Sequence, residues 1–306
     1  MRVKKSAQAA LKIIFIFAAL CAAACAEKDS REIIDRSGRM VTIDRPLNRI
    51  VSSAPSNTEI IVDLGLAGKL IAIDKYSGNI PGIPAGLPVI DFSYPDAEAL
   101  LALEPDIIIA NGHNVTVSGD DPFRLLKEMG IPVAYITMSK SIEDIYKDIE
   151  FIADLLRARD KGDELIRSMK TRVDNLAGKT SQIQIKRSVY FEISAAPDMI
   201  TFGKDSYIND MIAIIGAKNI FENDNWVLSP SAESIIERNP DVIITCVDYL
   251  DDPIGELKNR YGFNHINAVI NNRIYRVNMD SVVRPSARIV LALEQMSRAV
   301  YPEVYE

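Results

Sequence analysis

The sequence predicts an α/β protein of two Rossmann-like lobes with parallel sheets, joined by a single long α-helix, with a ligand cleft between the lobes. Three observations support this prediction. A fifteen-residue pattern occurs twice, 135 positions apart; strand-like apolar runs alternate with amphipathic segments; and an uninterrupted helical pattern separates the two halves. Strands separated by helices indicate parallel βαβ units. The duplication indicates that the two lobes are similar.

The repeated pattern occupies residues 95–109 and residues 230–244. In each copy, a proline and an N-cap residue (Asp96 or Ser231) precede a short helical stretch. A second proline then ends the helix and leads into a run of isoleucine and valine that is typical of a buried strand. Each copy also carries a glutamate at the same position, so each lobe presents one carboxylate at an equivalent point on its surface.

The first 24 residues predict a lipoprotein signal peptide, because basic residues precede an uncharged apolar run at 13–26. As a helix this run spans about 21 Å, which is too short for a hydrocarbon core of roughly 30 Å. The small residues directly before Cys25 resemble the lipobox of bacterial lipoproteins, in which the cysteine is acylated, although Ala22 stands where leucine is usual. Cleavage without lipidation is the alternative. Residues 25–31 are expected to form a tether.

The remaining chain divides into an N-terminal lobe at 32–157, a connecting helix at 158–180 and a C-terminal lobe at 181–306. A hairpin is expected at 33–43, with its turn at 35–38. Strands are expected at 49–53, 70–74, 106–110, 133–137, 187–193, 219–221, 241–247 and 273–278. Helices are expected at 57–64, 96–103, 122–129, 142–156, 209–215, 231–238, 263–270 and 286–300. In such lobes, ligands bind beyond the carboxyl ends of the strands.

Composition and missing motifs exclude several functions. Residues 1–24 hold four of the 35 basic side chains and none of the 42 acidic ones, so the chain without them has a net charge of −11, which disfavours nucleic-acid binding. Neither a nucleophile elbow nor a Gly-rich phosphate loop is present. With only His113 and His265, a bare zinc or manganese site is not expected. We therefore expect no enzyme activity, no resident metal and no cofactor, and we expect Cys246 to be a buried apolar residue.

The segment 49–59 resembles the opening strand and loop of periplasmic binding proteins for iron chelates and vitamin B12, the helical-backbone, class III substrate-binding proteins of ABC importers. The repeated unit, the connecting helix and the segment 284–289 are similar to the same family, so the resemblance covers residues 32–302. It implies an extracytoplasmic, monomeric lipoprotein that is anchored to the membrane through lipidated Cys25. Such a protein captures a metal chelate, cobalamin or a ferric siderophore, and delivers it to a permease dimer with its ATPase.

The resemblance also implies roles for individual residues. Glu98 and Glu233 fall on the motif that docks onto permease arginines; a helix-dipole role for these acids is the alternative. Apart from the resemblance, His113 follows the strand expected at 106–110, which makes it a further candidate contact to a chelate, or an exposed loop histidine. Aromatic rings and a few polar groups suit a flat macrocycle or a catecholate, and a cleft arginine can neutralise an anionic ferric chelate. The candidate ligand-binding residues are Tyr76, Phe92, Tyr94, Trp226, Asp280 and Arg284.

Three other functions remain open at this point. A haem-binding receptor of the same family would need axial ligands, for which the chain offers few candidates. A secreted enzyme that reuses the scaffold would show turnover rather than saturable binding alone. A sensory module would pass ligand occupancy to a membrane partner instead of delivering the ligand.

Overall fold

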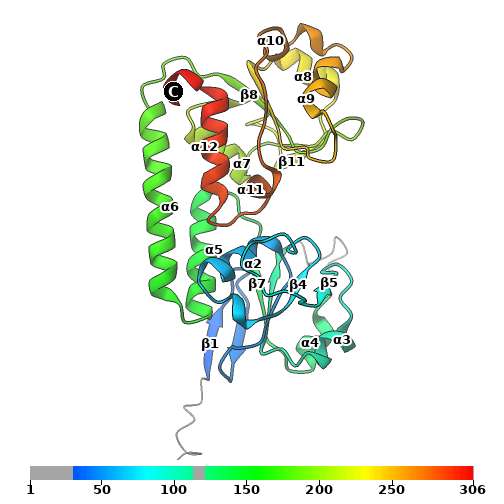
Figure 1. Ribbon diagram of the computed structural model, residues 1–306, viewed down its shortest axis with the longest axis vertical. Helices are drawn as coiled ribbons and strands as arrows, with labels where there is room; N and C mark the ends of the chain where they lie inside the picture. The colour runs from blue at the N-terminus through cyan, green and yellow to red at the C-terminus, as the bar shows by residue number, and fades with distance from the viewer. Residues whose placement is uncertain (1–29, 113–120, 306) are drawn as a thin grey trace, which may run out of the picture.

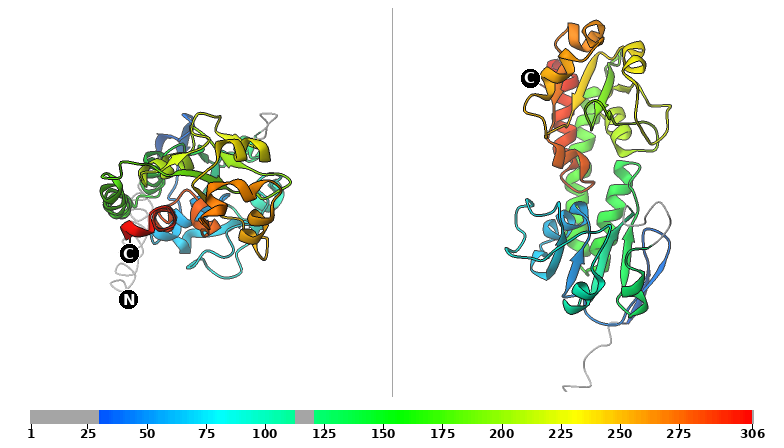
Figure 2. Two further views of the ribbon diagram at one scale, coloured as in Figure 1. Left: turned by 90° about the horizontal axis from the view of Figure 1, so that it is seen from above. Right: turned by 90° about the vertical axis from the view of Figure 1, so that its right-hand side faces the viewer.

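The computed structural model describes residues 30–112 and 121–305, and it places two α/β lobes one above the other along the long axis (Figure 1). The N-terminal lobe contains a five-stranded parallel sheet in the order β5-β4-β3-β6-β7. The C-terminal lobe contains a four-stranded parallel sheet in the order β10-β8-β12-β13. The right-hand view of Figure 2 shows helical segments that run between the lobes. The predicted fold class is confirmed.

The N-terminal lobe begins with the predicted hairpin and continues with alternating strands and helices. Its elements are β1 (Arg31–Ile34), β2 (Met40–Ile43), β3 (Ile50–Ser52), α2 (Pro55–Asp63), η1 (Ala67–Lys69), β4 (Leu70–Asp74), β5 (Val89–Ile90), α3 (Ala97–Ala102), β6 (Ile107–Asn111), α4 (Arg124–Glu128), β7 (Val133–Ile136) and α5 (Ile142–Leu155). Every residue of β6 is buried, as expected for a central parallel strand that is covered on both faces. The edge strand β5 was not predicted, because two residues show no periodicity.

The long helix α6 (Arg159–Thr180) corresponds to the predicted connecting helix, and the C-terminal lobe follows it. The lobe consists of β8 (Ser188–Glu192), β9 (Thr201–Phe202), α7 (Tyr207–Ile214), β10 (Lys218–Asn219), β11 (Val227–Leu228), α8 (Ala232–Arg238), β12 (Val242–Thr245), α9 (Pro253–Asn259), η3 (Phe263–His265), α10 (Asn267–Ile270), β13 (Ile274–Arg276), α11 (Met279–Val283), α12 (Ile289–Val300) and α13 (Pro302–Tyr305). The strands β9 and β11 form a small antiparallel sheet that was not predicted, and α9, α11 and α13 were also not predicted.

The prediction of a single helix at 263–270 is wrong, because the segment contains two short helices. Ile266 separates η3 from α10 with an extended backbone, at φ −76° and ψ 136°. Its side chain is fully buried, so packing into the lobe interrupts the helix. The closing helix starts at Ile289 rather than 286, and residues 286–288 form a bend and a turn in which the hydroxyl of Ser286 donates to Glu59 of the other lobe.

The repeated unit has the same backbone geometry in both lobes. Asp96 caps α3 by accepting a hydrogen bond from the amide of Ala99, and Ser231 caps α8 by accepting one from the amide of Ser234. After each helix, a residue at the equivalent position adopts the left-handed conformation, Glu104 at φ 46° and Asn239 at φ 42°. In each lobe the strand that follows pairs in parallel with the strand that comes first along the chain in the same parallel sheet, β6 with β3 and β12 with β8.

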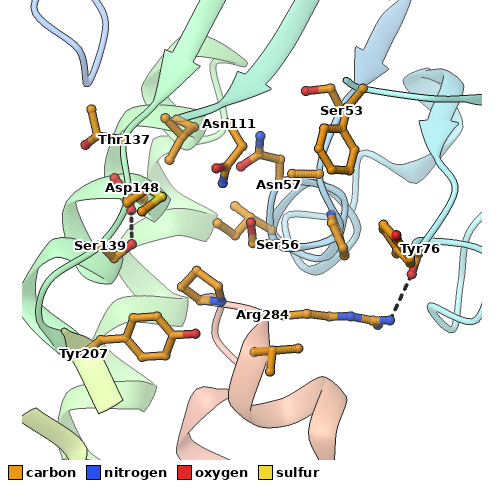
Figure 3. A pocket seen from close by; sticks show the side chains of 18 of the residues that line it. Ser53, Ser56, Asn57, Tyr76, Asn111, Thr137, Ser139, Asp148, Tyr207 and Arg284 are labelled. Atoms are coloured by element: carbon orange, nitrogen blue, oxygen red, sulfur yellow. Dashed lines mark hydrogen bonds between the residues drawn. The ribbon is translucent and has the colours of Figure 1, made fainter. Parts of the chain in front are cut away.

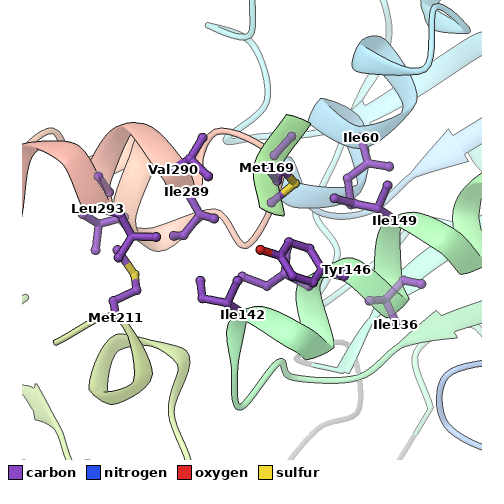
Figure 4. Close-up of a cluster of buried hydrophobic side chains, with 14 of the residues drawn as sticks. Ile60, Ile136, Ile142, Tyr146, Ile149, Met169, Met211, Ile289, Val290 and Leu293 are labelled. Carbon is purple, nitrogen blue, oxygen red and sulfur yellow. The ribbon is translucent and has the colours of Figure 1, made fainter. Parts of the chain in front are cut away.

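One apolar core runs from the N-terminal lobe into the C-terminal lobe through α5, α6 and α12 (Figure 4). Ile142 and Met169 belong to the same buried cluster as Met211 of α7 and Leu293 of α12. A polar contact reinforces this junction, because the carboxylate of Asp210 on α7 accepts a hydrogen bond of 2.8 Å from the amide of Ile142 at the start of α5. The lobes therefore share a core as well as a connecting helix. No helix in the described part of the chain is long and apolar enough to cross a membrane.

Gly162 allows α6 to approach α5 closely, since a Cβ atom at this position would lie 2.5 Å from the Cβ of Ala153. We expect Gly162→Ala to lower the free energy of unfolding by about 1–3 kcal/mol through overpacking. Gly178→Ala in the same helix is the control, because a Cβ atom there meets nothing within 4 Å. The control should be neutral or raise stability by up to about 1 kcal/mol. Urea denaturation measures both; equal effects of the two variants would contradict the close approach.

Candidate functional site

A pocket of about 370 Å³ lies between the two lobes (Figure 3). The N-terminal lobe contributes residues 53–57 after β3, the ends of β6 and β7, and side chains such as Tyr76 and Phe92. The C-terminal lobe contributes Ile193, Phe202, Tyr207, Trp226, Val227 and residues 283–285. The carboxyl ends of the parallel strands thus meet at the pocket, as expected for open α/β sheets. The predicted cleft between the lobes is confirmed.

Each lobe supplies a pair of aromatic rings to the pocket wall. Tyr76 and Phe92 of the N-terminal lobe have ring centroids 6.3 Å apart, and Phe202 and Trp226 of the C-terminal lobe have the same spacing. In the second pair, Phe202 belongs to β9 and Trp226 directly precedes β11. Gly203 makes this arrangement possible, since a Cβ atom there would lie 2.5 Å from the carbonyl oxygen of Asp224. The result is a largely apolar pocket with aromatic surfaces on both sides.

Asn57 lines the pocket and holds a buried amide oxygen that has no partner among the described residues. Its side chain is fully buried, and its Nδ2 donates to the carbonyl oxygen of Ile109 at 3.3 Å. Only the amide nitrogen can donate to that carbonyl, so the Oδ1 atom must face elsewhere. Among residues 30–112 and 121–305, Oδ1 has no hydrogen-bond partner, and Asn57 lines the pocket. A buried amide oxygen of this kind is suited to accept a hydrogen bond from a bound N–H or O–H group.

Asp148 on α5 is a buried carboxylate at the pocket. Arg36, in the turn of the β1–β2 hairpin, donates from Nε to its Oδ1 at 2.6 Å, and Ser139 donates to its Oδ2 at 2.8 Å (Figure 3). Burial raises the pKa of Asp148 to about 6, although the hydrogen bonds from Arg36 and Ser139 act in the opposite direction. The hairpin therefore supplies the counter-charge for a carboxylate that lies on the pocket side of α5.

Arg284 lines the pocket, but its guanidinium is already paired. Its side chain is only 7% exposed and lies 3.2 Å from the carboxylate of Glu59 and 2.8 Å from that of Asp280. Asp280 itself does not line the pocket, and its other oxygen accepts a hydrogen bond of 2.7 Å from Asn79. Tyr94 also lies outside the pocket lining, and it is 84% exposed. The structure thus brings four of the six candidate ligand-binding residues together: Tyr76, Phe92, Trp226 and Arg284.

Glu98 and Glu233 lie in the first turns of α3 and α8, and both are exposed. Figure 1 places both helices on the side of the molecule opposite α6. Because Asp96 and Ser231 already cap these helices, capping does not require the glutamates. Hydrogen bonds from its own backbone amide and from Ser231 lower the pKa of Glu233. The two carboxylates are therefore exposed and available for contact on one side of the molecule.

Asn57, Asp148 and Phe202 line the pocket but were not among the candidate ligand-binding residues. Asn57 and Phe202 lie in the segments that follow the strands predicted at 49–53 and 187–193, and ligands were expected beyond the carboxyl ends of such strands. For Asp148 the signal was an acid inside the buried stripe of an amphipathic helix, which the helical pattern alone does not single out. Cys25 and His113, with the signal peptide, lie outside the described residues.

Comparison with known proteins agrees with this geometry. Residues 50–280 match a family model described as periplasmic binding protein. The chain is 30% identical to the ABC transporter substrate-binding lipoprotein YvrC of Bacillus subtilis over the full length of both chains. It is 28% identical to the vitamin B12-binding protein of Vibrio cholerae over 82% of this chain and 88% of that protein. The chain belongs to the periplasmic binding protein family.

Solved structures show the same fold. A possible iron-binding (periplasmic solute-binding) protein from Staphylococcus epidermidis is 33% identical, with a TM-score of 0.74 over 84% of this chain and 100% of that chain. The periplasmic vitamin B12-binding protein BtuF of Vibrio cholerae is 24% identical, with a TM-score of 0.68 over 85% of this chain and 99% of that chain. The expectation of a substrate-binding protein of the ABC transporter type is confirmed.

Asp148 should make stability depend on pH. Because burial raises its pKa from 3.8 to about 6, the folded state gains stability from the bound proton below pH 3.8 and loses it as the pH rises through 6. We expect the free energy of unfolding of the wild-type protein, relative to that of Asp148→Asn, to fall by about 2.4 kcal/mol between pH 4 and pH 8. Urea denaturation across this range measures the difference. Parallel pH profiles for the two proteins would show that Asp148 does not titrate in this window.

Proposed function

We propose that this protein is the extracytoplasmic receptor of an ABC importer, and that it captures a cobalamin-like metal chelate and delivers it to the permease. The observation that carries the proposal is the pocket itself. The pocket is largely apolar and has an aromatic pair on each side. Among the described residues that line it, Arg284 carries a positive charge, and this charge is already paired with two carboxylates. Such a pocket suits a large ligand with flat apolar faces and little net negative charge.

Cobalamin fits these requirements better than an anionic chelate does. Its corrin ring presents apolar surface to aromatic side chains, and its peripheral amides can donate hydrogen bonds to an acceptor such as Asn57 Oδ1. The relatives named as vitamin B12-binding proteins, at 26–28% identity over about four fifths of this chain, support this substrate. A ferric siderophore is the second candidate, supported by the iron-binding protein of Staphylococcus epidermidis.

Ligand titration tests the substrate. Trp226 is the only tryptophan and lines the pocket, so we expect saturable quenching of its fluorescence by cyanocobalamin at one ligand per protein. Trp226→Ala should weaken binding about tenfold in isothermal titration calorimetry, because an aromatic contact is worth about 1.5 kcal/mol. Haemin and several ferric siderophores complete the panel, and tight binding of one of these alone would replace cobalamin as the substrate. Absence of binding to every chelate, or conversion of the ligand to a product, would refute the proposed function.

We further propose that Glu98 and Glu233 dock onto basic residues of the permease. Their support is positional: they are exposed, they occupy the same place in the two repeats, and other residues cap their helices. Two matching carboxylates on two similar lobes suit a partner with two-fold symmetry. The tether and the cysteine at position 25, acting as a lipid anchor, would keep a monomeric receptor close to this partner.

The double variant Glu98→Ala/Glu233→Ala should abolish uptake of labelled cyanocobalamin into vesicles that contain the permease and its ATPase, while the dissociation constant for the ligand stays unchanged. The matched control is Glu128→Ala/Glu237→Ala, which removes two exposed carboxylates from α4 and α8. We expect the control to retain uptake. A loss of ligand affinity in the first variant would instead assign its glutamates to the pocket or to the fold.

A further inference from the structure

A buried ion pair crosses between the lobes at the edge of the pocket. Arg284 follows α11 in the C-terminal lobe, and its Nη1 donates at 3.2 Å to Oε1 of Glu59, which is 1% exposed in α2 of the N-terminal lobe. Ser286 donates to the other carboxylate oxygen of Glu59. Arg288 lies farther away, at 3.8 Å from Glu59 and 3.8 Å from Asp63. The contact is therefore a small charged cluster in which Arg284 holds the central place.

The second nitrogen of the same guanidinium holds a loop of the N-terminal lobe. Nη2 of Arg284 lies 2.9 Å from the carbonyl oxygen of Tyr76 and 2.8 Å from Oδ1 of Asn79 (Figure 3). Asp280 joins the same hydrogen-bond network, since it accepts a hydrogen bond from Asn79 and is ion-paired with Arg284. A side chain of the C-terminal lobe thus fixes the backbone of a loop that belongs to the opposite lobe.

The loop that Arg284 holds carries part of the pocket wall. The ring of Tyr76 lines the pocket and packs against Phe92. Within its own lobe, the amide of Tyr76 donates at 2.8 Å to Oδ1 of Asp74. The hydroxyl of Ser77 donates to the other carboxylate oxygen of Asp74. Asp74 therefore holds Tyr76 on the amide side, and Arg284 holds it on the carbonyl side. The direction of the aromatic ring depends on both anchors.

We propose that Arg284 is a positioning residue: it holds Tyr76, and through it the Tyr76–Phe92 pair, in the pocket wall, and it does not neutralise the charge of the ligand. This inference rests on the proposed function, because it concerns how the same pocket binds its ligand. The guanidinium faces two carboxylates, Glu59 and Asp280, so its charge is compensated. A ligand that drew it away would leave Glu59 buried without its close cationic partner, which is strongly unfavourable.

A ligand-free experiment tests the positioning directly. Arg284→Lys keeps a positive charge near Glu59, but lysine lacks the planar fork that reaches Glu59 and the Tyr76 carbonyl at once. In hydrogen–deuterium exchange on the full chain, we expect exchange in residues 75–80 to rise at least tenfold while exchange in α3 and α4 is unchanged. Arg288→Gln is the matched control, because Arg288 contacts Glu59 and Asp63 across the same lobe contact. If exchange in residues 75–80 were equal in the two variants, Arg284 would only contribute to the contact between the lobes and would not position Tyr76. This result would overturn the proposal.

Binding measurements then separate positioning from direct charge recognition. Cyanocobalamin serves as the probe without net charge, and a ferric tricatecholate as the anionic probe. If Arg284 acts through Tyr76, Arg284→Lys weakens every probe that the wild-type protein binds, and the effect disappears in a Tyr76→Ala background. A loss with Arg284→Gln that is confined to the anionic probe would assign Arg284 to the ligand and overturn the proposal. If the wild-type protein binds neither probe, the proposed substrate fails, while the exchange experiment still decides the role of Arg284.

Discussion

The apolar core that continues from one lobe into the other is the constraint on which the rest of the structure depends. The helices α5, α6 and α12 contribute to a single buried cluster, and Asp210 of the C-terminal lobe binds the first amide of α5. Lobes that share a core cannot separate widely without exposing apolar surface. The pocket beside this core is therefore largely preformed, and only a modest rocking motion is compatible with the fold.

Polar groups around the pocket are arranged so that recognition depends on shape and hydrogen bonding more than on charge. Arg284 is compensated by Glu59 and Asp280, and Asp148 is compensated by Arg36. Asn57, which lines the pocket, keeps a buried amide oxygen without a partner among the described residues. A charged ligand would have to compete with pairs that are already formed and buried. A ligand with apolar faces and a few donors meets no such competition.

Sequence patterns predicted the large elements well, because burial on both faces of a parallel sheet requires continuous apolar runs. The strands β3, β4 and β7 fall within predicted runs, and β6 extends one residue beyond the run predicted at 106–110. The two-residue strands β5, β9 and β11 were missed, since their formation depends on a neighbour rather than on a local pattern. This loss matters for the site, because Phe202 lies in β9 and its ring partner Trp226 directly precedes β11. The split at Ile266 was missed for a similar reason, as burial in the lobe overrides helical periodicity there.

The sequence by itself determined the duplication, the parallel sheets and the matching positions of Glu98 and Glu233, because each of these follows from short-range spacing and residue type. Only the tertiary structure decided the partners of Arg284 and the place of Asp148 beside the pocket. Arg284 and Glu59 are 225 positions apart, and Asp148 and Arg36 are 112 positions apart. No local pattern encodes such pairs, since they exist only where the packing of two lobes and a hairpin brings the charges together out of water.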